Sequence, residues 1–173
     1  PIWHTKCSLL TDEKTLHKVL VSITDELQSR KQILRTAGVA NIDEYNRNAE
    51  KKLYRIVFAC DEIAEVLDKT GLSKQQKDEI LKIESELSII ARQGRAFGIH
   101  LVLATQRPDA AILNGQIQNN IDTRICGRAD NVLSQIILDN TDASDKIAKS
   151  SQGRFLTNSG KIFQAYWFDE NIL

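Results

Sequence analysis

Two adjacent carboxylates, Asp61 and Glu62, directly follow the apolar segment "RIVFAC" at residues 55–60. Strand-forming residues dominate that segment, so the acids stand where a strand is expected to end. A buried charge is costly unless it is paired or meets a metal ion. The pair therefore predicts one of two things: a strand end that reaches water, or a place where a cation is held.

A second apolar segment, "IHLVLAT" at residues 99–105, is followed by Gln106 and Arg107. Ligands of open parallel sheets bind at the carboxyl ends of the strands, where these polar residues would lie. We expect Asp61 to hold a hydrated Mg²⁺ through water and Glu62 to orient and deprotonate an attacking water molecule. Gln106 would then sense the terminal phosphate of a nucleotide. A solvated strand end is the simpler interpretation of either segment alone, but two polar strand ends separated by a helix favour a site.

The elements that must position these residues follow from hydrophobic periodicity. Apolar residues at helical spacing predict a long amphipathic helix over residues 12–36, which ends near Gly38. A more polar helix is expected over 43–52. The polar segment 69–79 contains Ser73, a favourable N-cap for a further helix that continues to Gly94.

Short apolar segments predict the strands. Residues 55–60 and 99–105 are expected to be buried on both faces, as in a parallel sheet. A third strand candidate covers 123–129, followed by a short helix over 130–139. The segments "GRFLT" and "KIFQAYWF" flank Asn158-Ser159-Gly160, which is typical of a hairpin. The predicted fold class is α/β, with a mostly parallel sheet flanked by helices and a C-terminal antiparallel hairpin, in one domain over 1–173.

Composition limits the possible function classes. The chain has 173 residues, of which 42% are hydrophobic and 27% charged, as in a globular domain. Lysine plus arginine equals aspartate plus glutamate at 23 each, which excludes a strongly basic nucleic-acid footprint for the whole chain but not a local one. No apolar stretch approaches the roughly 18 residues that span a bilayer, and no signal peptide opens the chain. We expect a cytoplasmic protein, and the start at Pro1 with no methionine predicts a piece of a longer chain.

The cysteines and histidines show no spacing typical of metal sites. An odd number of cysteines favours buried free thiols in a reducing compartment over a disulfide; they are Cys7, Cys60 and Cys126. The histidines are interpreted as structural; they are His4, His17 and His100.

Two long segments, "RIVFACDEIAEVLD" and "IARQGRAFGIHLVLATQRPDAAILNGQIQNNIDTRICGRA", resemble the core of FtsK/SpoIIIE-type motors. These motors are RecA-like, hexameric, DNA-translocating P-loop ATPases. The N-terminal "ELQSRKQILRTAGVANIDEYN" and the tail "GRFLTNSGKIFQAYWF" extend the resemblance over nearly the whole chain. The most specific part is 92–124.

The resemblance implies roles for individual residues. Asp61 and Glu62 correspond to the Walker B pair, with Asp61 toward the metal ion and both toward ATP, and Gln106 corresponds to the polar sensor of the next strand. Arg124 and Arg128 lie where an arginine at a subunit boundary would reach a neighbour's nucleotide. The alternative for either arginine is an ion pair with a local carboxylate. The implied cofactors are ATP and Mg²⁺.

The family places a loop that faces the central DNA channel at residues 109–120. The amide side chains that would contact phosphates there are Asn114, Gln116, Gln118, Asn119 and Asn120. A hydrated surface loop is the equally simple alternative.

Two departures from the family pattern matter. The phosphate-binding loop G-x-x-x-x-G-K-[ST] does not occur in these residues, and in the family it lies on the strand-helix unit that precedes them. We therefore expect this chain alone to bind ATP weakly or not at all and to be inactive. Gln135, where chromosomal translocases usually carry arginine, and the long segment 69–79 favour the conjugative branch of coupling ATPases.

The predicted function is the C-terminal part of an ATP-driven motor that pumps DNA through a hexameric ring, in chromosome partition or conjugative transfer. The expected partners are DNA, further copies of the chain and membrane-embedded transfer or division machinery, with the parent protein tethered to the membrane by an N-terminal segment. Two alternatives remain: a protein-translocating ATPase of a type VII-like secretion system, and a docking module that does not hydrolyse ATP.

Overall fold

The computed structural model describes residues 13–106 and 115–166, and the chain forms two compact units that divide between Thr105 and Gln106. The elements of the first unit are α1 (Glu13–Ala37), α2 (Ile42–Asn48), β1 (Ile56–Cys60), α3 (Ile63–Leu67), α4 (Lys74–Gln93), η1 (Arg95–Phe97) and β2 (Ile99–Leu103). Those of the second are α5 (Gly115–Asn119), β3 (Ile125–Cys126), α6 (Asn131–Leu138), α7 (Asp142–Lys146), β4 (Arg154–Thr157) and β5 (Ile162–Gln164). The single domain expected over 1–173 stays a prediction.

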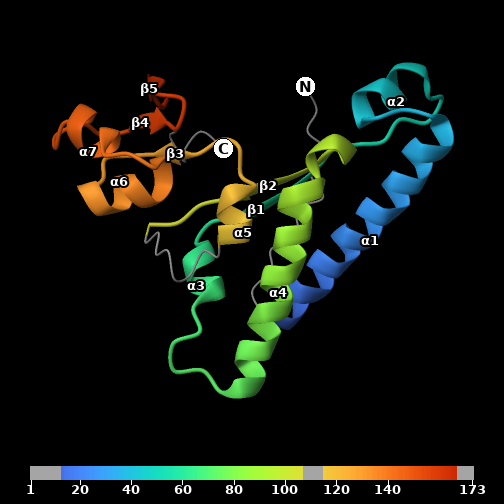
Figure 1. The fold of residues 1–173 in the computed structure, drawn as a ribbon, viewed down its shortest axis with the longest axis horizontal. Helices are drawn as coiled ribbons and strands as arrows, with labels where there is room; N and C mark the ends of the chain where they lie inside the picture. Colours follow the sequence, from blue (N-terminus) through green and yellow to red (C-terminus); the bar gives the residue numbers. More distant parts are fainter. Residues whose placement is uncertain (1–12, 107–114, 167–173) are drawn as a thin grey trace, which may run out of the picture. The chain divides into compact units, whose positions relative to one another are not determined.

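The core of the first unit lies between its two long helices, α1 and α4, which pack side by side (Figure 1). Both helices place leucine and isoleucine at helical spacing, so each buries one stripe. The large buried side chains of this pair are Leu20, Leu27, Leu34, Ile80, Ile83, Leu87 and Ile90. The prediction of a long helix that ends near Gly38 is confirmed: α1 stops at Ala37, and Gly38 has a φ of +68°.

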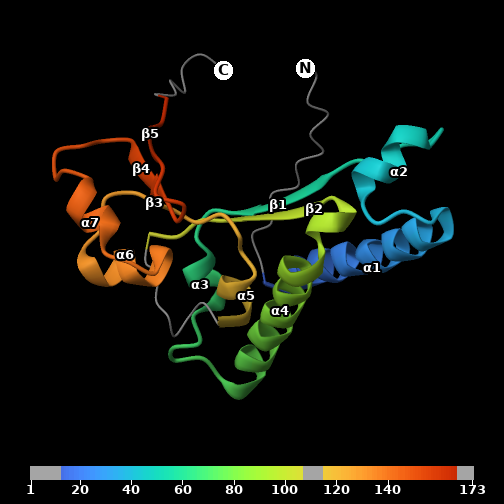
Figure 2. The same cartoon turned by 45° about the horizontal axis from the view of Figure 1, so that its top comes forward.

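The strands β1 and β2 form a parallel pair in which Ile56 lies opposite Ile99 and Cys60 opposite Leu103 (Figure 2). Successive side chains of a strand point to opposite faces. In β1 they alternate between half-buried and exposed, and Val57 and Val102 are 60% and 53% exposed. The expectation that both faces are buried is therefore wrong for the described residues, because only one set of alternating side chains is covered.

A tight turn connects α4 to β2 and fixes where β2 begins. Gly98 has a φ of +73°, and a Cβ atom there would lie 2.5 Å from Ile42 Cδ1. The buried Arg30 of α1 donates from Nη1 to the Phe97 carbonyl at 2.8 Å and from Nε to Glu26 Oε1 at 2.7 Å. The turn is thus tied by a charged hydrogen bond to the neighbouring helix.

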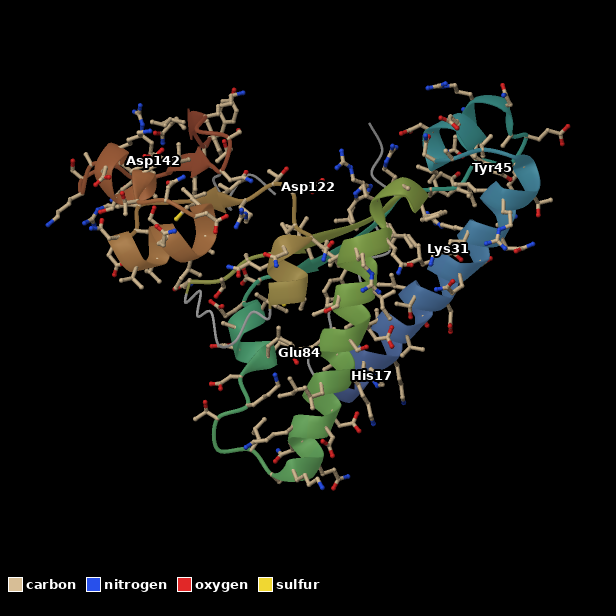
Figure 3. The ribbon with its side chains drawn as sticks, in the orientation of Figure 1. His17, Lys31, Tyr45, Glu84, Asp122 and Asp142 are labelled. Carbon is tan, nitrogen blue, oxygen red and sulfur yellow. The ribbon has the colours of Figure 1, made fainter. Side chains whose placement is uncertain are left out.

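The helix α3 and its connection to α4 form directly after the acid pair. Ser73 caps α4 with a capping box to Gln76, which confirms the predicted N-cap. Lys69 in the connection donates to Glu84 Oε1 at 2.6 Å, and the Glu84 side chain, labelled on α4 in Figure 3, is only 7% exposed. This ion pair holds the connection against α4.

The second helix, α2, ends at Asn48 and is shorter than the expected 43–52. The Asn46 side chain explains the difference, because it makes two hydrogen bonds of 2.8 Å with the backbone N–H and C=O of Leu53. These bonds bring the chain back toward α2 instead of continuing it.

The second unit is a small antiparallel sheet with the order β3-β4-β5, packed against α6 and α7. The β4–β5 pair confirms the predicted hairpin. The third strand candidate, expected over 123–129, forms only Ile125–Cys126 and pairs antiparallel with β4. The buried core of this unit consists of Cys126, Leu138, Ala143, Ile147 and Leu156.

The predicted α/β class is confirmed by the parallel pair, the helices and the antiparallel hairpin. Within the ranges 13–106 and 115–166, no helix is both long and apolar enough to cross a membrane.

Candidate functional site

The acid pair lies at the carboxyl end of β1, flanked by two hydrogen bonds to Ala104, the residue that follows β2. The Ala104 N–H donates to the Cys60 carbonyl at 2.9 Å, and the Ile63 N–H donates to the Ala104 carbonyl at 2.9 Å. The pairing of the two strands therefore continues past the last residue of each and encloses Asp61 and Glu62. The backbone position of both acids is set by the sheet and not by a free loop.

The two acids have different surroundings. Asp61 is exposed, whereas Glu62 is half-buried and its Oε1 atom is buried. Glu62 is also the N-cap residue of α3, with φ −134° and ψ 83°, but its side chain does not cap the helix. The Asp61 side chain thus faces water, whereas the Glu62 side chain is partly covered by the protein.

The electrostatic effect of the pair is visible on the preceding residue, Cys60. Burial raises the pKa of the Cys60 thiol, and the charges of Asp61 and Glu62 raise it further, opposed only by a backbone hydrogen bond from Glu62. Thiolate formation is thus suppressed beside the acids.

Gln106 follows the end of β2 closely. Ala104 is hydrogen-bonded beside the acid pair, and Thr105 and Gln106 come next along the chain. Gln106 is exposed and is the first residue of the second unit. Arg107 lies outside the described residues.

The donor set at β1 fits magnesium only in a partly hydrated form. Among the residues that the structure describes, no group of three or more His, Cys, Asp or Glu side chains gathers to hold a metal ion. Mg²⁺ normally keeps several waters and binds through one or two carboxylates plus substrate phosphates. The exposed Asp61 carboxylate matches that mode. The residues fit ATP in part, because the sequence supplies the acids but not the phosphate-binding loop.

The two candidate arginines differ in their contacts. Arg124 Nη2 pairs with Asp139 Oδ2, at the C-terminal end of α6, and Arg124 Nε is buried with no hydrogen-bond partner in the described part of the chain. Arg128 is exposed and lines a hollow of about 500 Å³ that also contains Lys149. The sequence did not decide which arginine would act at a subunit boundary. It also gave no indication that Lys149, distant from Arg128 along the chain, lines the same hollow.

The amide residues assigned to the channel loop fall partly on a short helix, α5. Asn114 and the side chain of Gln116 lie outside the described residues. Gln118 Nε2 donates to the Ile136 carbonyl at 2.7 Å, so this amide is used within the second unit. Asn119 and Asn120 are exposed.

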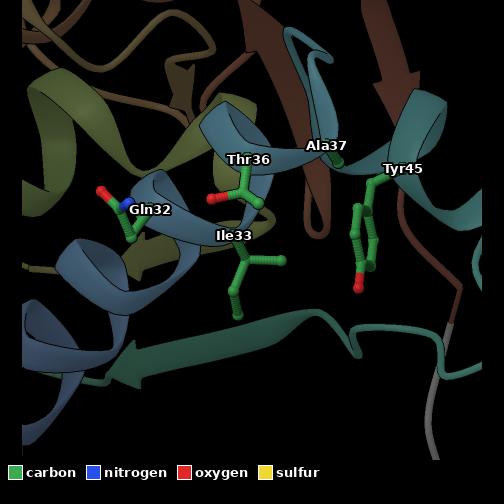
Figure 4. A pocket seen from close by; sticks show the side chains of 5 residues that line it. All are labelled: Gln32, Ile33, Thr36, Ala37 and Tyr45. Carbon is green, nitrogen blue, oxygen red and sulfur yellow. The ribbon is translucent and has the colours of Figure 1, made fainter.

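A further hollow, of about 350 Å³, lies in the first unit at the C-terminal end of α1. Its lining residues are Gln32, Ile33, Thr36, Ala37 and Tyr45 (Figure 4). Among the described residues, the side chains that line it are apolar or uncharged polar, and Tyr45 contributes a phenol.

Comparison with known proteins places these features in a family. The FtsK/SpoIIIE family matches residues 1–110. The DNA translocase FtsK of Chlorobaculum tepidum is 32% identical over 156 residues, covering 89% of this chain and 18% of the relative. The DNA translocase SftA of Bacillus subtilis is 31% identical over 164 residues, covering 91% of this chain and 16% of the relative. The chain thus spans less than a fifth of the length of these relatives.

Solved structures extend the comparison to three dimensions. The pCW3 conjugation coupling protein TcpA, solved as a monomer with ATPγS, has a TM-score of 0.87 and 39% identity, covering 94% of this chain and 47% of TcpA. EssC of Geobacillus thermodenitrificans has a TM-score of 0.67 at 24% identity, covering 88% of this chain and 27% of EssC, which indicates a shared fold. The fold is that of the RecA-like P-loop ATPases, and the chain belongs to the FtsK/SpoIIIE family.

Proposed function

We propose that this chain supplies the water-activating part of the ATPase site in an ATP-driven DNA translocase. The observation that carries the proposal is the carboxylate pair Asp61-Glu62, which the β1–β2 hydrogen bonds hold at the carboxyl end of a parallel strand. Family membership and the named DNA translocases among the relatives support DNA as the cargo. The 39% identity to a conjugation coupling protein favours conjugative transfer over chromosome partition.

In this proposal the neighbouring acids divide the chemistry between them. Mg²⁺, when bound with ATP, neutralises charge on the phosphates. Asp61, exposed to water, would hold the hydrated ion through its water ligands. Glu62, whose Oε1 is buried, would orient the attacking water and accept its proton. Gln106, which follows β2, would contact the terminal phosphate.

Of the two arginines, Arg128 is the better candidate to reach the nucleotide of a neighbouring subunit. It is exposed and lines the same hollow as Lys149, whereas the Arg124 guanidinium is engaged by Asp139. We expect Arg128→Ala subunits, mixed into wild-type assemblies, to lower hydrolysis more than in proportion to their number. The remaining partners proposed are DNA, contacted in part through the exposed Asn119, further copies in a hexameric ring, and membrane-embedded transfer machinery.

The first test is ATP hydrolysis by the full-length protein with and without DNA. Glu62→Gln should abolish hydrolysis and spare nucleotide binding, because the amide cannot accept the proton from water. The matched control is Glu65→Gln, which neutralises an exposed carboxylate on α3 and should hydrolyse ATP like the wild type. Equal rates for Glu62→Gln and Glu65→Gln would exclude the assigned role of Glu62.

The same assay separates the two alternative functions. If the rate of ATP hydrolysis does not change with DNA but increases with a secreted polypeptide, the cargo would be protein instead of DNA. Absence of hydrolysis under every condition would favour a docking module in which the two acids are a solvated strand end.

A further inference from the structure

The segment that runs from the last turn of α2 toward β1, here called the basic loop (residues 47–54, "RNAEKKLY"), is not used by the proposed ATPase site. It contains three cations, Arg47, Lys51 and Lys52, against one acid, Glu50. It lies at the amino end of β1, and the acid pair lies at the carboxyl end. Five residues at about 3.3 Å each separate the two by roughly 17 Å.

The loop is held in a defined shape. The Asn46 side chain bonds both the N–H and the C=O of Leu53 at 2.8 Å, and the Ala49 N–H donates to the Tyr45 carbonyl at 3.0 Å. These bonds close the loop at its base. The cations therefore project from a fixed base instead of a freely moving chain.

The cations of the loop are left available for a partner. Arg47, Lys51 and Lys52 are exposed, and within the described parts of the chain none of them forms an ion pair. The next cation along the chain, Arg55, is paired with Asp43 at 2.7 Å. The basic loop thus presents a local excess of positive charge on a chain whose net charge is zero.

An exposed aromatic ring accompanies these charges. Tyr54 is 85% exposed, although a tyrosine ring normally buries much of its apolar surface. Cations that follow a phosphate backbone, combined with an aromatic ring on which a base stacks, are the features of single-strand binding surfaces.

We propose that the basic loop is a nucleic-acid contact, with Arg47, Lys51 and Lys52 on backbone phosphates and Tyr54 stacked on a base. This inference rests on the proposed DNA translocase function and adds a contact point distinct from the channel loop. An anionic membrane is a poorer match than DNA, because the loop exposes a single large apolar side chain, too little for interfacial insertion. The proposed contact would bind a DNA strand at the amino end of β1, whereas the acid pair lies at its carboxyl end.

The test is DNA binding by the full-length protein at several salt concentrations, with fluorescent single-stranded and duplex oligonucleotides. Lys51→Glu/Lys52→Glu should weaken binding at low salt by about tenfold or more. It should reduce the salt slope by about 1.4 on the single strand and about 1.8 on the duplex, since each phosphate contact contributes about 0.7 and about 0.9 respectively. Lys74→Glu/Lys77→Glu is the control, because it reverses two exposed lysines in the first turn of α4. The control should bind DNA like the wild type.

Tyr54→Ala tests the stacking part of the proposal. It should weaken binding to the single strand by about tenfold, leave binding to the duplex unchanged and keep the salt slope, because it removes no charge. Tyr54→Phe should restore binding to the single strand.

Three results would overturn the inference. In the first, the loop variant binds DNA as well as the control variant. In the second, it loses self-association, which would make the loop a contact between subunits. In the third, it loses only binding to anionic phospholipid vesicles. A wild-type protein that neither binds DNA nor responds to it in hydrolysis would instead refute the proposed function, and the inference with it.

Discussion

Two neighbouring residues with the same charge, Asp61 and Glu62, have different environments because of their places on the backbone. Asp61 follows the last strand residue and is exposed, whereas Glu62 is the N-cap residue of α3 and turns its Oε1 into the protein. The extra methylene of glutamate lengthens the reach of the second acid. These environments support the proposed division of roles, in which Asp61 binds the metal ion and Glu62 activates water.

Cys60 provides a chemical probe of the acid pair. Burial and the charges of Asp61 and Glu62 raise its pKa, so it is a protonated, slowly reacting thiol at neutral pH. Removing one negative charge in Glu62→Gln should lower that pKa and increase the thiolate fraction at a given pH. We therefore expect faster alkylation of Cys60 in Glu62→Gln, followed peptide by peptide with mass spectrometry.

The internal control for this measurement is Cys126. Burial alone raises the pKa of that thiol, so its alkylation rate should not change in Glu62→Gln. A Cys60 rate that stays constant would mean that the Glu62 charge does not act on the strand end as the structure indicates.

At the scale of the elements, the turn from α4 to β2 restricts which residue can stand at position 98. We expect Gly98→Ala to lower the free energy of unfolding by about 1–3 kcal/mol, through the left-handed backbone and the contact with Ile42. Urea denaturation measures the change. Gly71→Ala is the matched control, since Gly71 has a φ of +70° but no atom within 4 Å of an added Cβ.

The comparison of these two glycines separates backbone strain from steric contact. Gly98→Ala should cost more than Gly71→Ala, because only the first variant also meets a buried side chain. Equal costs would show that the Ile42 contact relaxes freely.

The helices and their caps show which parts of the fold can be predicted from the sequence alone. The helices α1 and α4 and the N-cap Ser73 were predictable because a helical stripe and a capping box are local patterns. The helix α7 was not, because its sequence "DASDK" carries no stripe. It is held by non-local contacts: Ala143 is buried, and its N–H donates to the Ser134 hydroxyl at 3.1 Å.

The candidate site also contains some features that the sequence predicts and others that it does not. The position of Asp61 and Glu62 at a strand end was predictable, because the apolar segment and the acids are contiguous. The ion pair of Arg124 with Asp139 and the hollow that Arg128 shares with Lys149 were not, because both join residues that only the tertiary structure brings together. The roles assigned to these residues stay predictions.

At the scale of the whole molecule, one face of the β1–β2 pair exposes valines that a soluble chain would normally cover. Val57 and Val102 are both more than half exposed. Exposed apolar strand surface favours association between copies. We expect Val57→Thr/Val102→Thr to reduce self-association of the 173-residue chain in light scattering, with little loss of stability.

The control for this effect is Val132→Thr, which changes an equally exposed valine on α6 outside the parallel pair. It should leave self-association unchanged. If both variants behave like the wild type, the open face of the strand pair is not what drives association.

The bonds between Asn46 and Leu53 also have an evolutionary consequence. They join Asn46, just before the basic loop, to Leu53 near its end, which favours the same start of β1 when the residues between them change. Substitution at 47–52 is thereby uncoupled from the register of the strand that carries the acids. The charge of that loop, and with it the proposed nucleic-acid contact, can therefore vary while the end of the strand that carries Asp61 and Glu62 stays the same.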